Sequence, residues 1–188
     1  MRLFYASFLS PESIRVYDEL VAGWIAGHLG SLRAVPPGSQ HLTLAFLGDL
    51  PDSELPAARE ILNDLASEPS FPFSLGTPRV LRGRGGPRLI CADLTCGKER
   101  VVQLQDLLAR ELAERMPERG IRPKPPHVTL ARFARGADRE AVRGVERELS
   151  RIGFPARDDR IAAIHLVRST LTPQGPIYRS VGRADLAN

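Results

Sequence analysis

The sequence lacks most of the features that mark a membrane protein, a secreted protein or a metal-binding protein. None of its apolar runs approaches the length that a membrane-spanning helix needs. Residues 1–9 are too short for a signal peptide and carry no convincing cleavage site, so we interpret them as a strand and expect a cytoplasmic protein. Cysteine is scarce. Cys91 and Cys96 lie an odd number of positions apart on a predicted strand, which disfavours a disulfide, and no further cysteine or nearby histidine completes a zinc site.

Lysine is almost absent as well, because Lys98 and Lys124 are the only two in the chain. Arginine therefore supplies nearly all of the positive charge in a chain whose formal net charge is +4. A guanidinium group suits phosphate better than an ammonium group does, so this balance is compatible with a polyanionic substrate, although it can also follow from genome composition. A hydrophobic content of 43% and a charged content of 26% are ordinary for a globular protein, and we predict a single domain over residues 1–188.

Two similar motifs stand out against this background. Both have the sequence His-x-Thr-Leu-Ala, at residues 41–45 and 127–131. Alternation with a period of two predicts β-strands that carry histidine and threonine on one face and bury apolar residues on the other. The residues expected to be buried are Leu42, Leu44, Val128 and Leu130. With the histidines and threonines available, chance predicts only roughly a tenth of one His-x-Thr string. The alternative is that two strands happen to carry surface polar residues.

The two motifs are 86 positions apart, and the same offset relates other parts of the chain. It relates the helical pattern of residues 12–28 to that of residues 98–114. A constant offset across strands and helices indicates an internal duplication, with repeats at approximately residues 2–86 and 88–186. Such a duplication predicts two lobes related by a rough twofold axis, with the two His-x-Thr strands meeting across a central cleft.

The other elements follow from hydrophobic periodicity and turn signals. Helices are predicted at residues 11–29, 52–67, 98–116 and 138–150. Ser10 followed by Pro11 is a typical start for the first of them. Strands are predicted at residues 2–9, 71–81, 88–95, 161–169 and 177–181, besides the two motif strands. The glycine-rich segment 82–87 is interpreted as a hairpin loop, because it lacks the Lys-Ser/Thr ending and the following helix of a P-loop. We predict an α+β fold of two pseudo-symmetric lobes, each an antiparallel sheet with helices on its outer face.

Two facing histidines suit displacement at phosphorus. An imidazole titrates near neutral pH, so His41 and His127 can supply a base for the attacking oxygen and an acid for the leaving oxygen. The near-symmetry of the motifs leaves open which histidine takes which role. Thr43 and Thr129 can donate hydrogen bonds to the non-bridging phosphate oxygens. The scheme needs no metal or cofactor, and the sequence offers no third ligand at metal-binding spacing. The two remaining histidines are expected to have structural roles: His28 and His165.

The paired motifs in a duplicated chain resemble the two-histidine phosphoesterase superfamily. The strings at residues 41–48 and 126–132 are similar to those of its RNA 2′,3′-cyclic phosphodiesterase branch, also known as bacterial and archaeal 2′–5′ RNA ligases. The C-terminal Gly175-Pro176-x-Tyr178 is similar to that branch as well. The resemblance implies opening of a 2′,3′-cyclic phosphate to a 2′-phosphate, with weak, reversible 2′–5′ joining. It also implies a catalytic set and a phosphate contact: His41, Thr43, His127 and Thr129, with Arg132.

Arg132 raises a geometric question. On a regular strand its side chain shares the face of Leu130, away from His127, and it turns toward the histidines only if the strand twists or bulges. The alternative for Arg132 is a surface salt bridge. At the equivalent position of the first motif stands Phe46, which is free either to pack in the core or to stack on a base.

Three functions are compatible with these residues. The first is an enzyme that acts on RNA ends or on nucleoside 2′,3′-cyclic phosphates. The second is a phosphodiesterase for another cyclic phosphate, such as an ADP-ribose cyclic phosphate. The third is a non-catalytic RNA-binding module, which the two intact motifs disfavour, because a binder has no need for paired histidines. We expect a monomer with no membrane partner.

Overall fold

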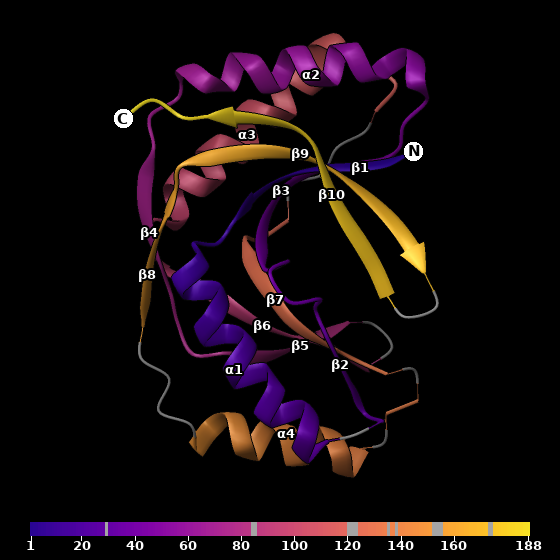
Figure 1. The fold of residues 1–188 in the computed structure, drawn as a ribbon, viewed down its shortest axis with the longest axis vertical. Coiled ribbons are helices and arrows are strands. Elements are labelled where there is room, and N and C mark those ends of the chain that lie inside the picture. The colour runs from indigo at the N-terminus through magenta and orange to yellow at the C-terminus, as the bar shows by residue number, and fades with distance from the viewer. Residues whose placement is uncertain are drawn as a thin grey trace.

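The computed structural model describes residues 1–28, 30–83, 86–119, 124–134, 136–137, 139–151, 156–172 and 175–188, with the backbone alone at Ile25. Within these residues the chain forms ten strands and four α-helices (Figure 1). The strands are β1 (Arg2–Phe8), β2 (Leu32–Ala34), β3 (His41–Asp49), β4 (Phe71–Leu75), β5 (Arg79–Gly83), β6 (Gly86–Cys96), β7 (His127–Phe133), β8 (Arg157–Ile161), β9 (Ala163–Thr172) and β10 (Gly175–Asp185). The helices are α1 (Pro11–Gly27), α2 (Leu55–Asp64), α3 (Lys98–Arg115) and α4 (Arg139–Arg151), and short 3-10 turns flank α2 at Asp52–Glu54 and Leu65–Ser67.

The start of α1 shows how local sequence sets an element. The helix begins at Pro11, as predicted, because proline has the backbone angle of a first helical residue and its missing N–H would be unsatisfied there. The Ser10 hydroxyl accepts a hydrogen bond from the backbone N–H of Ser13 at 3.3 Å, which caps the helix. Asp159 on β8 in turn accepts hydrogen bonds from both the backbone N–H and the hydroxyl of Ser10. This contact joins the first helix to a strand near the other end of the chain.

The strands form a single path in the order β10-β9-β1-β3-β7-β6-β4-β8, with β2 beside β7 and β5 beside β6. Every pairing between these strands is antiparallel. The motif strands β3 and β7 are neighbours at the centre of the path, where Leu42 pairs with Val128. These two residues are separated by the 86-position offset, which supports the proposed duplication. The predicted α+β fold of antiparallel strands is confirmed.

The sheet divides at the β3–β7 contact into two half-sheets. The His41 half-sheet holds β10, β9, β1 and β3, and the His127 half-sheet holds β7, β6, β5 and β2, with β4 and β8 continuing beyond β6. The half-sheets do not follow the order of the sequence. β1 takes the late strand β9 as its second neighbour, whereas β6 takes the earlier strand β5. Each half-sheet is therefore built from both early and late parts of the chain.

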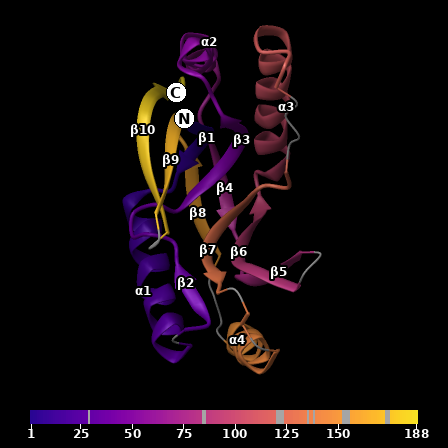
Figure 2. The same ribbon diagram turned by 90° about the vertical axis from the view of Figure 1, so that its right-hand side faces the viewer.

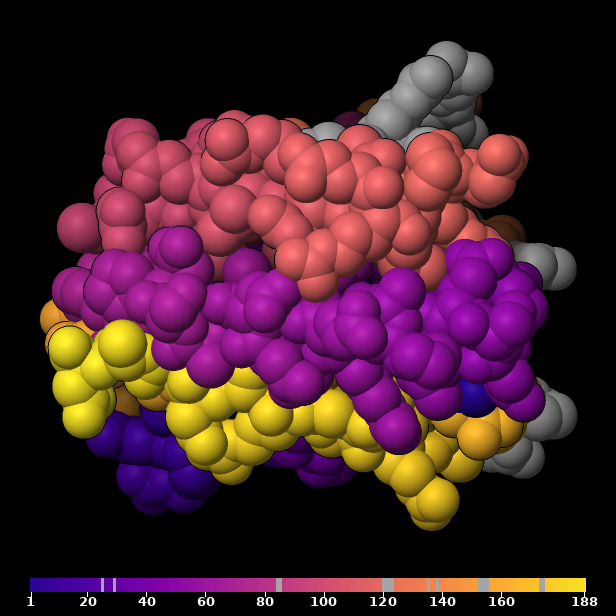
Figure 3. Space-filling model, turned by 90° about the horizontal axis from the view of Figure 1, so that it is seen from above, coloured from indigo at the N-terminus to yellow at the C-terminus, as the bar shows by residue number. Residues whose placement is uncertain are grey.

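The helices cover the outer face of both half-sheets, as expected. α2 packs on the His41 half-sheet, where the Tyr5 hydroxyl donates a hydrogen bond to the Ala58 carbonyl at 2.7 Å. α2 and α3 lie side by side and form one outer wall next to β10 (Figure 3). α1 and α4 lie at the opposite end of the molecule (Figures 1 and 2). His28, just after α1, contacts Glu148 of α4 at 2.8 Å, which is the structural role expected for this histidine.

Two strands of the structure were not predicted, and one predicted strand is divided. Residues 71–81 form β4 and β5, separated at Gly76, where an added Cβ would lie 2.6 Å from a side-chain carbon of Thr95. The unpredicted strands are β2, which has only three residues, and β8, which consists mainly of charged residues. The predicted hairpin at residues 82–87 joins β5 to β6, although residues 84–85 lie outside the described residues.

Candidate active site

The two motif strands bury one face and expose the other, as their alternation predicted. All four apolar residues expected behind the motifs are at most 2% exposed: Leu42, Leu44, Val128 and Leu130. The four polar residues are partly exposed: His41, Thr43, His127 and Thr129. We call the surface that carries these four side chains the motif face. It lies opposite the face that α2 and α3 cover.

A β-bulge interrupts each motif strand at the equivalent position. In β3 the pairing with β1 skips Leu44, and in β7 the pairing with β6 skips Leu130. Each bulge adds a second buried residue, Ala45 or Ala131, and so reverses the alternation beyond it. The bulge in β7 supplies the condition that the sequence left open, because it moves Arg132 off the face of Leu130. The bulge turns Arg132 to the motif face, and it turns Phe46 there in the same way.

The backbone fixes both motif histidines in the same tautomer. The Nδ1 atom of His41 lies 2.7 Å from the Ser39 carbonyl oxygen, and that of His127 lies 2.9 Å from the Pro125 carbonyl oxygen. A carbonyl oxygen only accepts, so in both rings Nδ1 carries the hydrogen. Nε2 is then the nitrogen that gains or loses a proton. Within the described residues, neither Nε2 atom has a hydrogen-bond partner.

Aromatic rings surround His41. Its ring centroid lies 5.1 Å from that of Phe4, 5.8 Å from that of Phe8 and 5.2 Å from that of Tyr178. Burial among these rings lowers the pKa of His41 to about 4, against a smaller opposing effect of the hydrogen bond to Ser39. The positive charges of Arg132 and His127 lower this pKa further. His41 is therefore neutral at physiological pH.

Charged groups, by contrast, flank His127. Asp93 on β6 lies directly opposite His127, so the two side chains share the motif face. Asp93 forms a two-pronged ion pair with Arg79 of β5, in which Nη2 and Oδ1 are 3.1 Å apart. Beside them, burial first and then the Asp93 carboxylate raise the pKa of the Cys91 thiol to about 11. Cys91 is therefore a passive thiol, as expected, and both cysteines are free.

A buried glutamine connects the two motifs. The Gln105 side chain on α3 is 2% exposed, and its Nε2 donates hydrogen bonds to the Thr43 carbonyl at 3.2 Å and to the Lys124 carbonyl at 3.1 Å. It thus ties the first motif strand to the segment that leads into the second. The sequence analysis missed this residue. The available signal was an amide within the apolar stripe of the helix, between Val101 and Leu108.

The family model for the 2′-5′ RNA ligase superfamily matches residues 18–171. The chain belongs to this superfamily. An RNA 2′,3′-cyclic phosphodiesterase of Thermus thermophilus is 34% identical over 185 residues, which cover 95% of this chain and 86% of the relative. An RNA 2′,3′-cyclic phosphodiesterase of Aquifex aeolicus is 32% identical over 160 residues, which cover 78% of each chain. A Thermus thermophilus protein of known crystal structure has a TM-score of 0.79 at 29% identity and covers 99% of this chain and 98% of its own.

These matches confirm the resemblance drawn from the two motifs. Two further side chains of this superfamily member, those of Phe46 and Lys124, lie beside the motif residues. Phe46 is 45% exposed on the motif face, where its ring packs against Phe4 at 5.8 Å. The Lys124 ammonium group lies over the same ring, 4.7 Å from its centroid. Lys124 comes from the segment before β7, so the second motif contributes a cation to the aromatic residue of the first. Both groups suit a nucleotide, which has an aromatic base and a negative charge.

The fourth histidine, His165, also lies on the motif face. Its Nδ1 lies 3.0 Å from the Ser180 hydroxyl oxygen, and its ring packs edge-on against Phe8 with 5.0 Å between centroids. It supports the aromatic surroundings of His41 through Phe8, in keeping with the packing role expected for it. Across the described part of the chain, no group of three or more His, Cys, Asp or Glu side chains is placed to hold a metal ion. No helix in those residues is long and apolar enough to cross a membrane.

Proposed function

We propose that this member of the 2′-5′ RNA ligase superfamily hydrolyses terminal 2′,3′-cyclic phosphates of RNA to 2′-phosphomonoesters. The observation that carries the proposal is the pair of imidazoles on one face, each with Nδ1 bound to a backbone carbonyl and Nε2 open. The names of the Thermus thermophilus and Aquifex aeolicus relatives, both RNA 2′,3′-cyclic phosphodiesterases, support the same activity.

In the proposed reaction the two Nε2 atoms handle the two protons. One neutral imidazole, of His41 or His127, accepts a proton from the attacking water, whose oxygen forms the new bond to phosphorus. The bond from phosphorus to O3′ breaks, and the other imidazole, protonated at Nε2, donates its proton to O3′. The Nδ1–H bond to the carbonyl is kept in both protonation states, so neither ring has to turn. Each role is worth on the order of two to four powers of ten in rate.

Hydroxyl and guanidinium groups would bind the phosphate as negative charge develops on it. Thr43 and Thr129 share the motif face with the histidines, and a hydroxyl can donate to a non-bridging oxygen. Arg132, on the same face beyond its bulge, supplies a positive charge that favours both the substrate and the transition state. No metal or cofactor enters this scheme. The base of the terminal nucleotide would stack on Phe46.

The same arrangement accounts for a joining reaction. A ribose 5′-hydroxyl that takes the place of water loses its proton to the same base and forms a 2′–5′ linkage. In the reverse direction the two histidines exchange roles, because every step runs backward through the same transition state. All proposed groups come from one chain, so the activity requires no second copy. We expect a monomer that acts on RNA ends or nucleoside 2′,3′-cyclic phosphates in the cytoplasm.

The test is turnover of a nucleoside 2′,3′-cyclic phosphate in the presence of EDTA, followed by phosphorus NMR. We expect metal-free conversion to the 2′-monoester and no 3′-monoester. Loss of activity with EDTA and its return with zinc or manganese would contradict the scheme. Faster turnover of an ADP-ribose cyclic phosphate would favour the second candidate substrate. RNA binding without turnover of either compound would leave a binding module.

A further inference from the structure

Two arginines face each other on neighbouring strands of the His127 half-sheet. Arg33 on β2 is directly opposite Arg132 on β7, and both are exposed. Residues opposite each other in an antiparallel pair point to the same face, with Cβ atoms about 4.5–5.5 Å apart. Because the bulge turns Arg132 to the motif face, Arg33 lies on the motif face as well. It extends the positive charge of the site by one strand.

Nothing in the described part of the chain neutralises this pair. Neither Arg33 nor Arg132 has a hydrogen bond or an ion pair there. Other arginines nearby do have acidic partners, such as Arg79 with Asp93 and Arg82 with Glu146. Like charges directly opposite each other destabilise a sheet. An anion that binds between or beside the two guanidinium groups would offset this cost.

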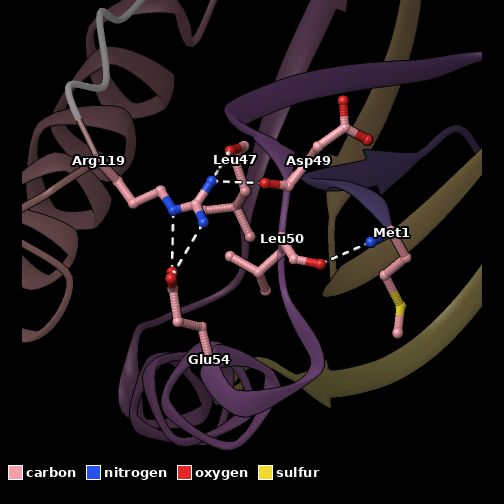
Figure 4. Close-up of polar contacts among 6 residues, drawn as sticks. All are labelled: Met1, Leu47, Asp49, Leu50, Glu54 and Arg119. Carbon is pink, nitrogen blue, oxygen red and sulfur yellow. Dashed lines mark hydrogen bonds and ion pairs between the residues drawn. The ribbon is translucent and has the colours of Figure 1, made fainter.

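The arginine of the second repeat that is equivalent to Arg33 has a structural role. Arg119 lies 86 positions after Arg33, which is the offset between the two motifs. Its guanidinium group forms two hydrogen bonds with Glu54, at 2.9 and 3.0 Å, and donates to the Asp49 carbonyl at 2.6 Å (Figure 4). Arg119 therefore joins the end of β3 to the turn before α2. Arg33 makes no such contact with any residue that the structure describes.

We infer that Arg33 binds the next phosphate of an RNA strand, the one on the 5′ side of the terminal nucleotide. This inference rests on the proposed function. Arg132 then lies between the cyclic phosphate at the histidines and the second phosphate at Arg33. Arg33 and Arg132 come from neighbouring strands, which lie about 4.8 Å apart, so both guanidinium groups can contact the same RNA end. Arg33 would make an RNA end a better substrate than a mononucleotide.

The experiment compares two substrates that differ by one phosphate. The first is a nucleoside 2′,3′-cyclic phosphate, and the second is a dinucleotide that ends in the same group. For each protein, the preference is the ratio of the two kcat/KM values. In Arg33→Gln we expect the preference for the dinucleotide to fall about tenfold, mainly through KM, because the variant loses a charge-assisted hydrogen bond to the second phosphate. For the dinucleotide, the salt dependence of kcat/KM should also be shallower in Arg33→Gln than in the wild type, by about 0.7 in the slope of log kcat/KM against log salt.

Two matched variants test whether the change follows from a general loss of positive charge or from a loss of stability. Arg110→Gln removes the same charge from the exposed side of α3 on the outer wall, and we expect its preference to be unchanged. Arg33→Gln should keep or slightly raise Tm, because it removes a repulsion, whereas Arg119→Gln should lower Tm. If Arg33→Gln instead lowers Tm as Arg119→Gln does, the residue is structural and the inference is wrong. Equal losses on both substrates would also overturn it.

Failure of the proposed function gives a different result. In that case the wild-type protein turns over neither substrate. The inference is then judged from the Kd of a dinucleotide that ends in a 2′-phosphate, measured for the wild type and for Arg33→Gln. A Kd about tenfold weaker in the variant supports a phosphate site at Arg33, and an equal Kd refutes it.

Discussion

The backbone around His41 resembles that around His127, whereas the neighbouring side chains differ. Both strands have a bulge three residues after the histidine, and both histidines bind the carbonyl of the residue two positions earlier. Yet His41 lies among three aromatic rings, whereas His127 lies opposite Asp93 and its Arg79 partner. The two backbones are alike because both imidazoles need the same tautomer. We expect the neighbouring side chains to differ because they contact different parts of the substrate.

The residues after the two bulges show the same division. Phe46 and Arg132 occupy equivalent positions on the motif face, one aromatic and one cationic. A nucleotide end is itself asymmetric, with a base on one side of the ribose and a phosphate chain on the other. A symmetric site would suit it poorly. We therefore expect the His41 side to bind the base and the His127 side to bind the backbone.

The largest expected effect comes from the feature that the two sides share. His41→Ala and His127→Ala should each lower kcat by at least about a hundredfold, because each removes one of the two proton-transfer groups. Thr43→Val and Thr129→Val should be milder, since each loses one hydrogen bond to a charged oxygen. Steady-state turnover of a nucleoside 2′,3′-cyclic phosphate measures both.

His28→Ala is the control for the histidine variants, because this side chain contacts Glu148 away from the motif face. It should stay within a few-fold of the wild type once folding has been checked by circular dichroism. Near-normal turnover of either motif variant would mean that the two sides are not partners in one reaction.

A smaller effect is expected from the residue that distinguishes the His41 side. Phe46→Ala should raise KM for a nucleoside 2′,3′-cyclic phosphate about tenfold, because stacking of a base on an aromatic ring is worth about 1–3 kcal/mol. The same variant should have little effect on a cyclic phosphate that lacks a base, such as that of ribose. Equal losses on both compounds would show that Phe46 does not recognise the base.

The last prediction concerns stability instead of turnover, and it follows from the burial of His41. Folding lowers the pKa of this imidazole from 6.5 to about 4, so between these pH values the unfolded chain binds a proton that the folded chain does not. The stabilisation is fully present above pH 6.5 and is lost as the pH falls toward 4. Between pH 7 and pH 5 the wild type should lose about 2 kcal/mol more unfolding free energy than His41→Gln. Urea unfolding at the two pH values measures the difference, and identical losses would place His41 in water.

The sequence predicted the motif strands well and the bulges within them not at all. Alternation identified the exposed histidines and threonines, because side chains on a strand point to alternate faces. The bulges at Leu44 and Leu130 insert a residue of the same apolar kind that a regular strand would bury. No change of residue type reveals them, so the sequence left open which face of the strand Arg132 occupies. Their only trace is the Leu-Ala pair at the end of each motif.

The missed parts of the fold are those set by partners far away in the sequence. β2 has three residues and depends on its contact with β7, and β8 is charged because it pairs with β4 at a sheet edge. Gln105 acts through two backbone carbonyls that only the folded chain brings to it. The helices were predicted more accurately, because Ser10, Pro11 and the periodic apolar residues act on the local backbone.

The pairing of β1 with β9 also determines when the protein can fold. Leu3 and Tyr5 are synthesised long before their neighbours Arg168 and Leu166, because β9 follows β1 only after most of the other strands. Until then β1 has an open edge, which is a template for unwanted association. Such distant pairing slows folding, because a long loop must close before the contact can form. We expect the chain to acquire its stable sheet only after β9 has been synthesised, and to be prone to association during that interval.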